Sequence, residues 1–165
     1  MKAISLWQPW ASLIMLGAKR VETRSWRPPE ALIGARVMIH AAKHLDPVAF
    51  MEPFASVLGH HPSSAPRGAL LGSVLLEGAW RIDHAADAEL VAHEYHRLDG
   101  GGGRPVFDVE AAKYELAFGD YTVGRWAWGL ADVRRLREPI SYRGGQRFFN
   151  VENTVAAAQG GEHLR

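Results

Sequence analysis

The chain has 165 residues, of which 47% are hydrophobic and 22% are charged, and these values are typical of one ordinary globular domain. It contains no cysteine, which excludes disulfide bonds, thiolate zinc ligands and cysteine nucleophiles. No signal peptide opens the chain and no run of 18 apolar residues occurs in it, so we expect a cytoplasmic protein with no membrane partner.

The net charge of +1 is unevenly distributed along the chain. Residues 19–27 carry a net charge of +3 and residues 125–147 carry +4, whereas residues 83–120 carry −6. If the two basic stretches share a face of the protein, they would attract a polyanion. The competing interpretation is that they are solvated edges of strands, and charge alone leaves both interpretations open.

Residues 1–26 predict a strand, a helix and a second strand. Residues 1–6 form the first strand. Pro9 suits the first turn of the helix because it has no N–H group to leave unpaired, and Gly17 can end that helix in the left-handed conformation. Residues 21–26 alternate apolar and polar side chains, as a half-buried strand does.

The next predicted elements are a strand, a helix and a long strand. Residues 36–42 predict the first of these strands. Asp46 is a suitable N-cap for a helix over residues 48–58, which Pro53 should kink or shorten. Residues 69–82 begin with an almost wholly apolar run, which predicts a strand that is buried on both faces or closes a barrel.

The second half of the chain predicts two helices and a strong strand. The helices span residues 85–98 and 109–118, and the glycine-rich residues 99–105 between them predict a mobile loop. Residues 125–136 predict the strand, with tryptophans available for a core. Residues 142–151 predict a turn followed by a short closing element.

Strands separated by helices of varying length predict an α+β fold. The strands are spaced too irregularly for a doubly wound parallel sheet, so we expect a small mixed, mostly antiparallel β-barrel with peripheral helices. We expect a single domain over residues 1–152 and a frayed tail over residues 153–165.

The most informative cluster of charges follows the first predicted helix. Gly17 leads directly to Lys19, and Glu22 and Arg24 are two residues apart on a predicted strand, so their side chains point to one face. We expect the amine, the carboxylate and the guanidinium to converge beside the mouth of the barrel, where they can bind phosphate or move protons. An exposed, salt-bridged strand would have the same spacing, so the spacing alone leaves both interpretations open.

A second set of residues is expected to line the same cleft and to bind nucleic acid. Trp10 begins a helix whose free N–H groups suit anions, and its indole can stack on a base, although such a tryptophan is more often in the core. His40 lies near Lys43 on a predicted strand, and Arg125 follows a glycine at the cleft rim. The candidate nucleic-acid-binding residues are Gln8, Trp10, Ser12, His40, Lys43, Arg125, Arg143 and Gln146.

Neither a metal site nor a cofactor is expected. The eight histidines lie in separate segments and have no cysteine partners. His93 and His96 are three residues apart, whereas the metalloprotease motif places its histidines four apart. The glycines at 100–103 lack the following Lys-Ser/Thr pair of a phosphate-binding loop, and no Gly-x-Ser-x-Gly elbow occurs.

These pieces together resemble the ASCH domain, a PUA-like β-barrel family. The resemblance begins with residues 5–14 and continues through residues 17–26, where Gly17, Lys19, Glu22 and Arg24 satisfy the family's Gly-x-Lys-x-x-Glu-x-Arg pattern. The later segments that resemble the family are residues 39–43, 68–74, 124–128 and 143–151. The resemblance covers the chain to about residue 152, except for its acidic middle.

The resemblance implies a cleft between the first helix and the barrel, with RNA, another single-stranded nucleic acid or a modified nucleoside as partner. Family members include RNA-binding modules, ribonucleases and enzymes that remove acyl groups from N4-acylated cytidine. The last group uses a lysine, a threonine three residues on and a more distant glutamate. Lys19 matches the lysine, Glu22 stands in place of the threonine nucleophile, and Glu77 is only a candidate for the glutamate.

Three functions therefore compete. In a metal-independent ribonuclease, Lys19 or Glu22 would take the 2′-hydroxyl proton and Arg24 would stabilise the charge on the phosphorane. In an amidohydrolase acting on N4-acylated cytidine nucleosides, Glu22 would orient a water beside Lys19. In a non-catalytic module the same cleft would only bind RNA, because fold does not fix function. The sequence leaves the choice, and the oligomeric state, open.

Overall fold

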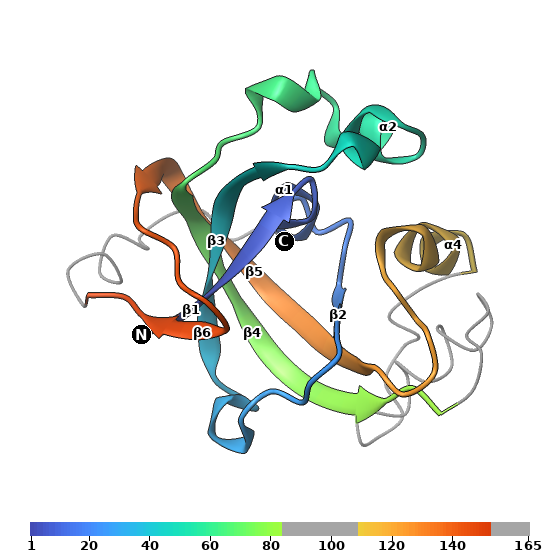
Figure 1. The fold of residues 1–165 in the computed structure, drawn as a ribbon, viewed down its shortest axis with the longest axis vertical. Coiled ribbons are helices and arrows are strands. Elements are labelled where there is room, and N and C mark those ends of the chain that lie inside the picture. Colours follow the sequence, from blue (N-terminus) through green and yellow to red (C-terminus); the bar gives the residue numbers. More distant parts are fainter. Residues whose placement is uncertain (84–108, 153–165) are drawn as a thin grey trace.

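The computed structural model describes residues 1–83 and 109–152, and its six strands form one mixed sheet (Figure 1). The strands are β1 (Lys2–Gln8), β2 (Val21–Arg24), β3 (Arg36–Leu45), β4 (Ala69–Arg81), β5 (Trp126–Ser141) and β6 (Phe148–Asn150). Their order in the sheet is β2-β5-β4-β3-β1-β6. The pair β1 and β3 is parallel and the other neighbouring pairs are antiparallel. The predicted α+β class and the mostly antiparallel sheet are confirmed.

The predicted barrel is open between its two edge strands, β2 and β6, which are not neighbours in the described sheet. Trp26, just after β2, packs edge-on against Phe148 of β6 with ring centroids 5.8 Å apart. The strand β2 is only four residues long, and Pro28 and Pro29 soon follow it without N–H groups to extend a ladder. Side chains rather than backbone hydrogen bonds therefore fill this gap in the barrel.

Short helices surround the sheet: α1 (Trp10–Met15), α2 (Phe54–Leu58) and α4 (Val109–Phe118), with 3₁₀ turns at Glu30–Leu32, Pro47–Phe50 and Pro62–Ser64. The predicted helix over residues 48–58 is divided at Pro53 into a 3₁₀ turn and α2, as a proline inside a helix favours. Asp46 caps the turn, since its Oδ1 accepts a hydrogen bond from the Val48 N–H at 3.0 Å.

None of the described helices is long and apolar enough to cross a membrane. The helix predicted over residues 85–98, the loop predicted over residues 99–105 and the tail over residues 153–165 lie outside the described residues.

The helix α1 is anchored in the main core and thereby positions the site. Its residues Ile14 and Met15 pack in one buried cluster with Val74 of β4 and Trp128 of β5. The first six residues of β4 are all buried, which agrees with the prediction of a strand covered on both faces. Because α1 is fixed against β4 and β5, Trp10 at its start and the turn after its end have defined positions.

Candidate functional site

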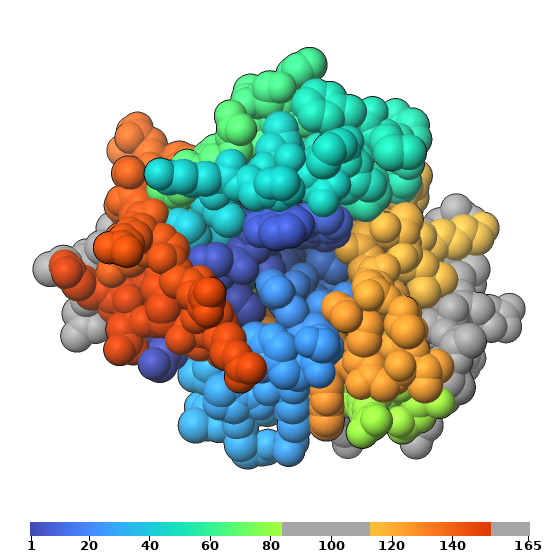
Figure 2. Space-filling model, in the orientation of Figure 1, coloured from blue at the N-terminus to red at the C-terminus, as the bar shows by residue number. Residues whose placement is uncertain are grey.

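Three cavities, which we call the Lys19, Arg24 and His40 cavities, lie along one face of the molecule. Their volumes are about 460, 240 and 670 Å³, and the first and third are in the size range of small-molecule sites. The N-terminal segment contributes to all three linings, and Figure 2 shows it set back between the closing segment, the segment after β3 and the segment after α4.

The three cavities adjoin one another because they share lining residues. Trp10 and Glu22 line both the Lys19 cavity and the Arg24 cavity. Ser5 and Trp7 line both the Arg24 cavity and the His40 cavity. The cavities therefore follow one another across the face formed by the end of β1 and the start of α1.

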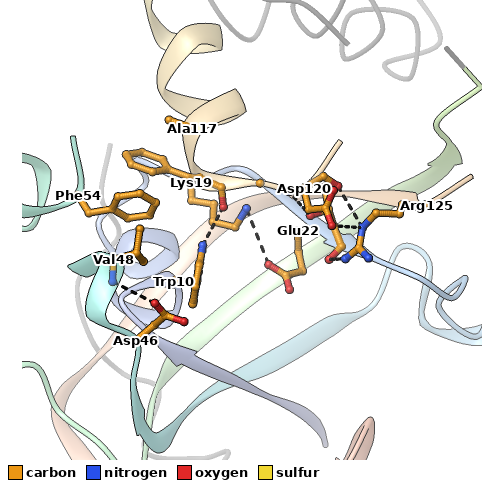
Figure 3. A pocket seen from close by; sticks show the side chains of 12 residues that line it. Trp10, Lys19, Glu22, Asp46, Val48, Phe54, Ala117, Asp120 and Arg125 are labelled. Atoms are coloured by element: carbon orange, nitrogen blue, oxygen red, sulfur yellow. Dashed lines mark hydrogen bonds and ion pairs between the residues drawn. The ribbon is translucent and has the colours of Figure 1, made fainter. Parts of the chain in front are cut away.

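The three charged groups predicted to converge do so in the structure. Lys19 is only 1% exposed, and its Nζ donates a hydrogen bond to the Val21 carbonyl at 2.5 Å. The same nitrogen lies 3.9 Å from Glu22 Oε2, and Glu22 Oε1 lies 2.8 Å from Arg24 Nε. Figure 3 shows the Lys19 amine and the Glu22 carboxylate facing each other beside Trp10. The amine therefore lies at the wall of a cavity, away from bulk water.

A second buried carboxylate, Glu115 of α4, completes the cluster. It is fully buried, and its Oε1 lies 3.7 Å from Lys19 Nζ. Its Oε2 accepts from the Arg20 N–H at 2.7 Å and its Oε1 from the Val21 N–H at 3.1 Å. Burial raises the pKa of the Glu115 carboxyl, and the Lys19 charge and these two N–H groups offset part of that increase. Glu115 therefore joins α4 to the turn that carries Lys19.

Sequence reasoning missed Glu115 because it counted this residue only as one acid in the stretch with a net charge of −6. A usable signal was its spacing of three residues from Phe118, which puts both side chains on one helix face. Phe118 is buried as well, so that face is the inner one. Glu77, the sequence-based candidate for a distant glutamate, is exposed on β4 and lies in none of the three cavity linings.

The lining of the Lys19 cavity has more carboxylates than cations. Arg125 accompanies Lys19, and the carboxylates belong to Glu22, Asp46 and Asp120. Arg125 is itself neutralised, because its Nε lies 3.2 Å from Asp120 Oδ2. A free phosphate is disfavoured in such a cavity, whereas a neutral group with hydrogen-bonding edges is suited to it.

One side of the Lys19 cavity is aromatic. Trp10, Phe54 and Phe118 belong to its lining. The Trp10 and Phe54 rings meet edge-on with centroids 6.2 Å apart, and the Trp10 Nε1–H donates to the Phe118 carbonyl at 2.8 Å. The indole is therefore held in one orientation, so it presents a fixed apolar surface to a flat ligand.

The His40 cavity has the opposite electrostatic character. Lys43 and Arg143 are exposed in its lining, and none of the described residues that line it carries a carboxylate. Gln146 adds a neutral amide from the closing segment. This cavity is therefore suited to an anionic group such as a phosphate.

His40 itself is buried and neutral in character. Its Nε2 lies 3.0 Å from the Tyr142 carbonyl, which can only accept, so Nε2 carries the hydrogen. Its Nδ1 therefore accepts from the Ser5 hydroxyl at 3.0 Å. Burial lowers the pKa of His40, and the hydrogen bond to Tyr142 offsets part of that decrease. His40 thus holds β1, β3 and the closing segment together, and the positive charge comes from its neighbours.

Two of the predicted ligand-contacting residues lie in the interior instead. The Gln8 amide is fully buried, donating from Nε2 to the Pro66 carbonyl at 2.7 Å and accepting at Oε1 from the Ser12 N–H at 3.1 Å. Ser12 is also buried, within α1. Both residues stabilise the junction of β1 with α1, so their positions differ from those expected of nucleic-acid contacts. The other predicted residues line the Lys19, Arg24 or His40 cavity.

Comparison with known proteins agrees with the resemblance seen in the sequence. A crystal structure of a point variant of the ASCH protein from Zymomonas mobilis is similar, with a TM-score of 0.50 and 20% identity over 94% of both chains. A crystal structure of ASCH from the same organism has a TM-score of 0.49 and 19% identity, covering 95% of this chain and 91% of that one. No curated protein matches the chain. The model of the ASCH domain matches residues 4–140, and the chain therefore belongs to the ASCH domain family.

Proposed function

We propose that this protein binds single-stranded RNA across the three adjoining cavities. The observation that carries this proposal is the division of charge between the two larger cavities. The His40 cavity presents Lys43 and Arg143 without a carboxylate, whereas the Lys19 cavity is aromatic on one side and holds excess carboxylates. A nucleic acid strand has the same division, with anionic phosphates on one side and flat neutral bases on the other.

The order of the three cavities defines the path of the RNA strand. One base occupies the Lys19 cavity against Trp10, where it contacts the edge formed by Lys19 and Glu22. The adjoining phosphate lies in the Arg24 cavity. The Arg24 guanidinium there is partly exposed and pairs with Glu22 through Nε, so its terminal N–H groups are the ones that meet the phosphate. The next phosphates reach the basic residues of the His40 cavity. Single-stranded RNA suits this path because its bases are free to turn out of the stack.

The salt dependence of RNA affinity tests this proposal. Replacing Lys43 and Arg143 together with alanine should weaken binding of a fluorescent single-stranded RNA. It should also make the plot of log affinity against log salt less steep by about 1.4, because each lost phosphate contact contributes about 0.7 on a single strand. Arg81→Ala removes an exposed arginine that lies in none of the three cavities, and it should change neither value. A salt-independent affinity would contradict the proposal.

A second candidate function is cleavage of the bound RNA, and the position of Glu22 favours it. The Glu22 carboxylate lines two cavities and lies between the Lys19 amine and the Arg24 guanidinium. In this proposal Glu22 takes the proton of a 2′-hydroxyl, whose oxygen bonds to phosphorus as the bond to the 5′ oxygen breaks. A solvent water protonates the leaving oxygen, the Lys19 ammonium holds the Glu22 carboxylate in place, and Arg24 balances the charge of the phosphorane.

Labelled RNA incubated in EDTA tests this step. Cleavage should leave 2′,3′-cyclic phosphate and 5′-hydroxyl ends, and Glu22→Gln should slow it by about 10²-fold or more while binding is retained. Cleavage that survives Glu22→Gln would rule out this role. The same preparations can be given N4-acetylcytidine, since the Lys19 cavity also suits a neutral nucleoside. Release of cytidine that depends on Lys19 would support an amidohydrolase in place of a ribonuclease.

A further inference from the structure

Trp7 is an exposed tryptophan in a strand whose neighbouring residues are buried. Its side chain is 53% exposed, whereas Leu6 and Gln8 on either side are in the interior. The pairing of β1 with β3 is irregular at this point, because Leu6 pairs with Ala41 while Gln8 pairs with Leu45. Such irregularities redirect side chains and are common beside functional sites. The extra residues belong to β3, so the outward-facing indole of Trp7 lies opposite a bulge of that strand.

The indole is held in place by a second ring. The centroid of the His44 ring lies 4.2 Å from that of Trp7, with the two planes tilted by 56°. His44 is one of the extra residues of β3, between Ala41 and Leu45, where the pairing with β1 is irregular. Since the indole is positioned before a ligand arrives, little side-chain entropy remains to be lost on binding.

Trp7 also lies between the cationic groups that the proposed function assigns to phosphates. It lines the Arg24 cavity on one side and the His40 cavity, with Lys43 and Arg143, on the other. Consecutive bases and phosphates alternate along a strand, and an exposed aromatic ring between cationic sites matches that alternation. A protein partner would not require cations on both sides of the ring.

We propose that Trp7, supported by His44, is a second base-stacking site, which takes the nucleobase next to the one in the Lys19 cavity. The inference rests on the proposed function and deepens it, since it makes two adjacent nucleotides the unit that is recognised. Every base has a π face, so this site accepts any base, in contrast to the Lys19 cavity, where Lys19 and Glu22 contact the edge of the base.

A pair of matched variants tests the stacking site. Trp7→Ala should weaken binding of a short single-stranded RNA by about five- to 150-fold, whereas Trp7→Phe should retain most of the affinity. Phe50→Ala is the control, because Phe50 is 51% exposed, also contacts a histidine ring, and lies in none of the three cavities. The control should bind as the unmodified protein does.

An RNA with one abasic position locates the stacked base. A set of RNAs is compared, each with one base removed at a different position. Removing the base that stacks on Trp7 should weaken binding to the unmodified protein and should have no additional effect on binding to Trp7→Ala.

Trp7→Ala with unchanged affinity and an unchanged salt dependence would overturn the stacking site and leave the proposed function standing. Failure of the unmodified protein to bind RNA would overturn both. A change of oligomeric state in Trp7→Ala, measured by sedimentation, together with unchanged RNA affinity would instead identify a protein contact.

Discussion

Replacing Glu115 with alanine is expected to lower the free energy of unfolding by about 3–5 kcal/mol, because it removes one partner from a buried ion pair. The Glu115 carboxylate is fully buried against the Lys19 amine. It also accepts the backbone N–H groups of Arg20 and Val21, which would be left without this acceptor. The loss combines two broken hydrogen bonds with a buried Lys19 charge that keeps only Glu22, at 3.9 Å, as its partner. Urea unfolding measures this loss directly.

Glu77→Ala is the matched control for Glu115→Ala. Glu77 is exposed, so its removal should change the free energy of unfolding by less than about 1 kcal/mol. Combining Glu115→Ala with Lys19→Met should cost less than the sum of the two single changes, because both remove the same pair. Equal effects of Glu115→Ala and Glu77→Ala would show that the buried pair does not stabilise the fold.

The ionisation of Glu115 should also make the free energy of unfolding depend on pH. Its pKa is raised above the ordinary value of 4.5, so the folded state holds this proton more tightly than the unfolded state does. The stability contributed by this tightly held proton is therefore fully present below pH 4.5 and is lost as the pH rises through the raised pKa, whereas the hydrogen bonds to Arg20 and Val21 remain. The unfolding free energy of the unmodified protein should fall with increasing pH relative to that of Glu115→Gln.

Gly72→Ala is expected to destabilise the protein by about 3 kcal/mol or more, because the added methyl group has no space. A Cβ at this position would overlap the Arg134 carbonyl oxygen of β5, and it would lie 2.6 Å from Met15 Sδ and 2.9 Å from Arg135 Cα. The side chain of Met15 can move, but the backbone of β5 cannot do so without separating from β4. The change should also displace α1 and, with it, the indole of Trp10.

Gly78→Ala tests whether this loss is steric. Gly78 lies on the same strand, and a Cβ there would meet nothing within 4 Å. Alanine loses less backbone freedom on folding than glycine, so this variant should be neutral or more stable by about 0.5–1 kcal/mol. Thermal unfolding of both variants distinguishes a steric clash at Gly72 from a general effect of replacing a glycine in β4. Equal stability of Gly72→Ala and Gly78→Ala would show that β4 and β5 do not pack as closely as described.

Local patterns in the sequence determined most of the elements. Pro9 and Gly17 mark the ends of α1, and Pro53 divides the predicted helix, because each restricts or frees backbone angles at its own position. The two-residue period of Glu22 and Arg24 likewise put their side chains on one face without reference to the rest of the chain. The family motif lies in this same N-terminal segment, which is why membership in the ASCH domain family was predictable.

The composition of the site was decided only by tertiary structure. Glu115 meets Lys19 because α4 packs beside the turn after α1, and no local pattern encodes that contact. The ring of His44 meets Trp7 because β3 is irregular where it pairs with the end of β1. The separation of a basic cavity from a carboxylate-rich one depends on the order of strands in the sheet. Periodicity and backbone preference act over a few residues, whereas strand order and register join segments far apart in the chain.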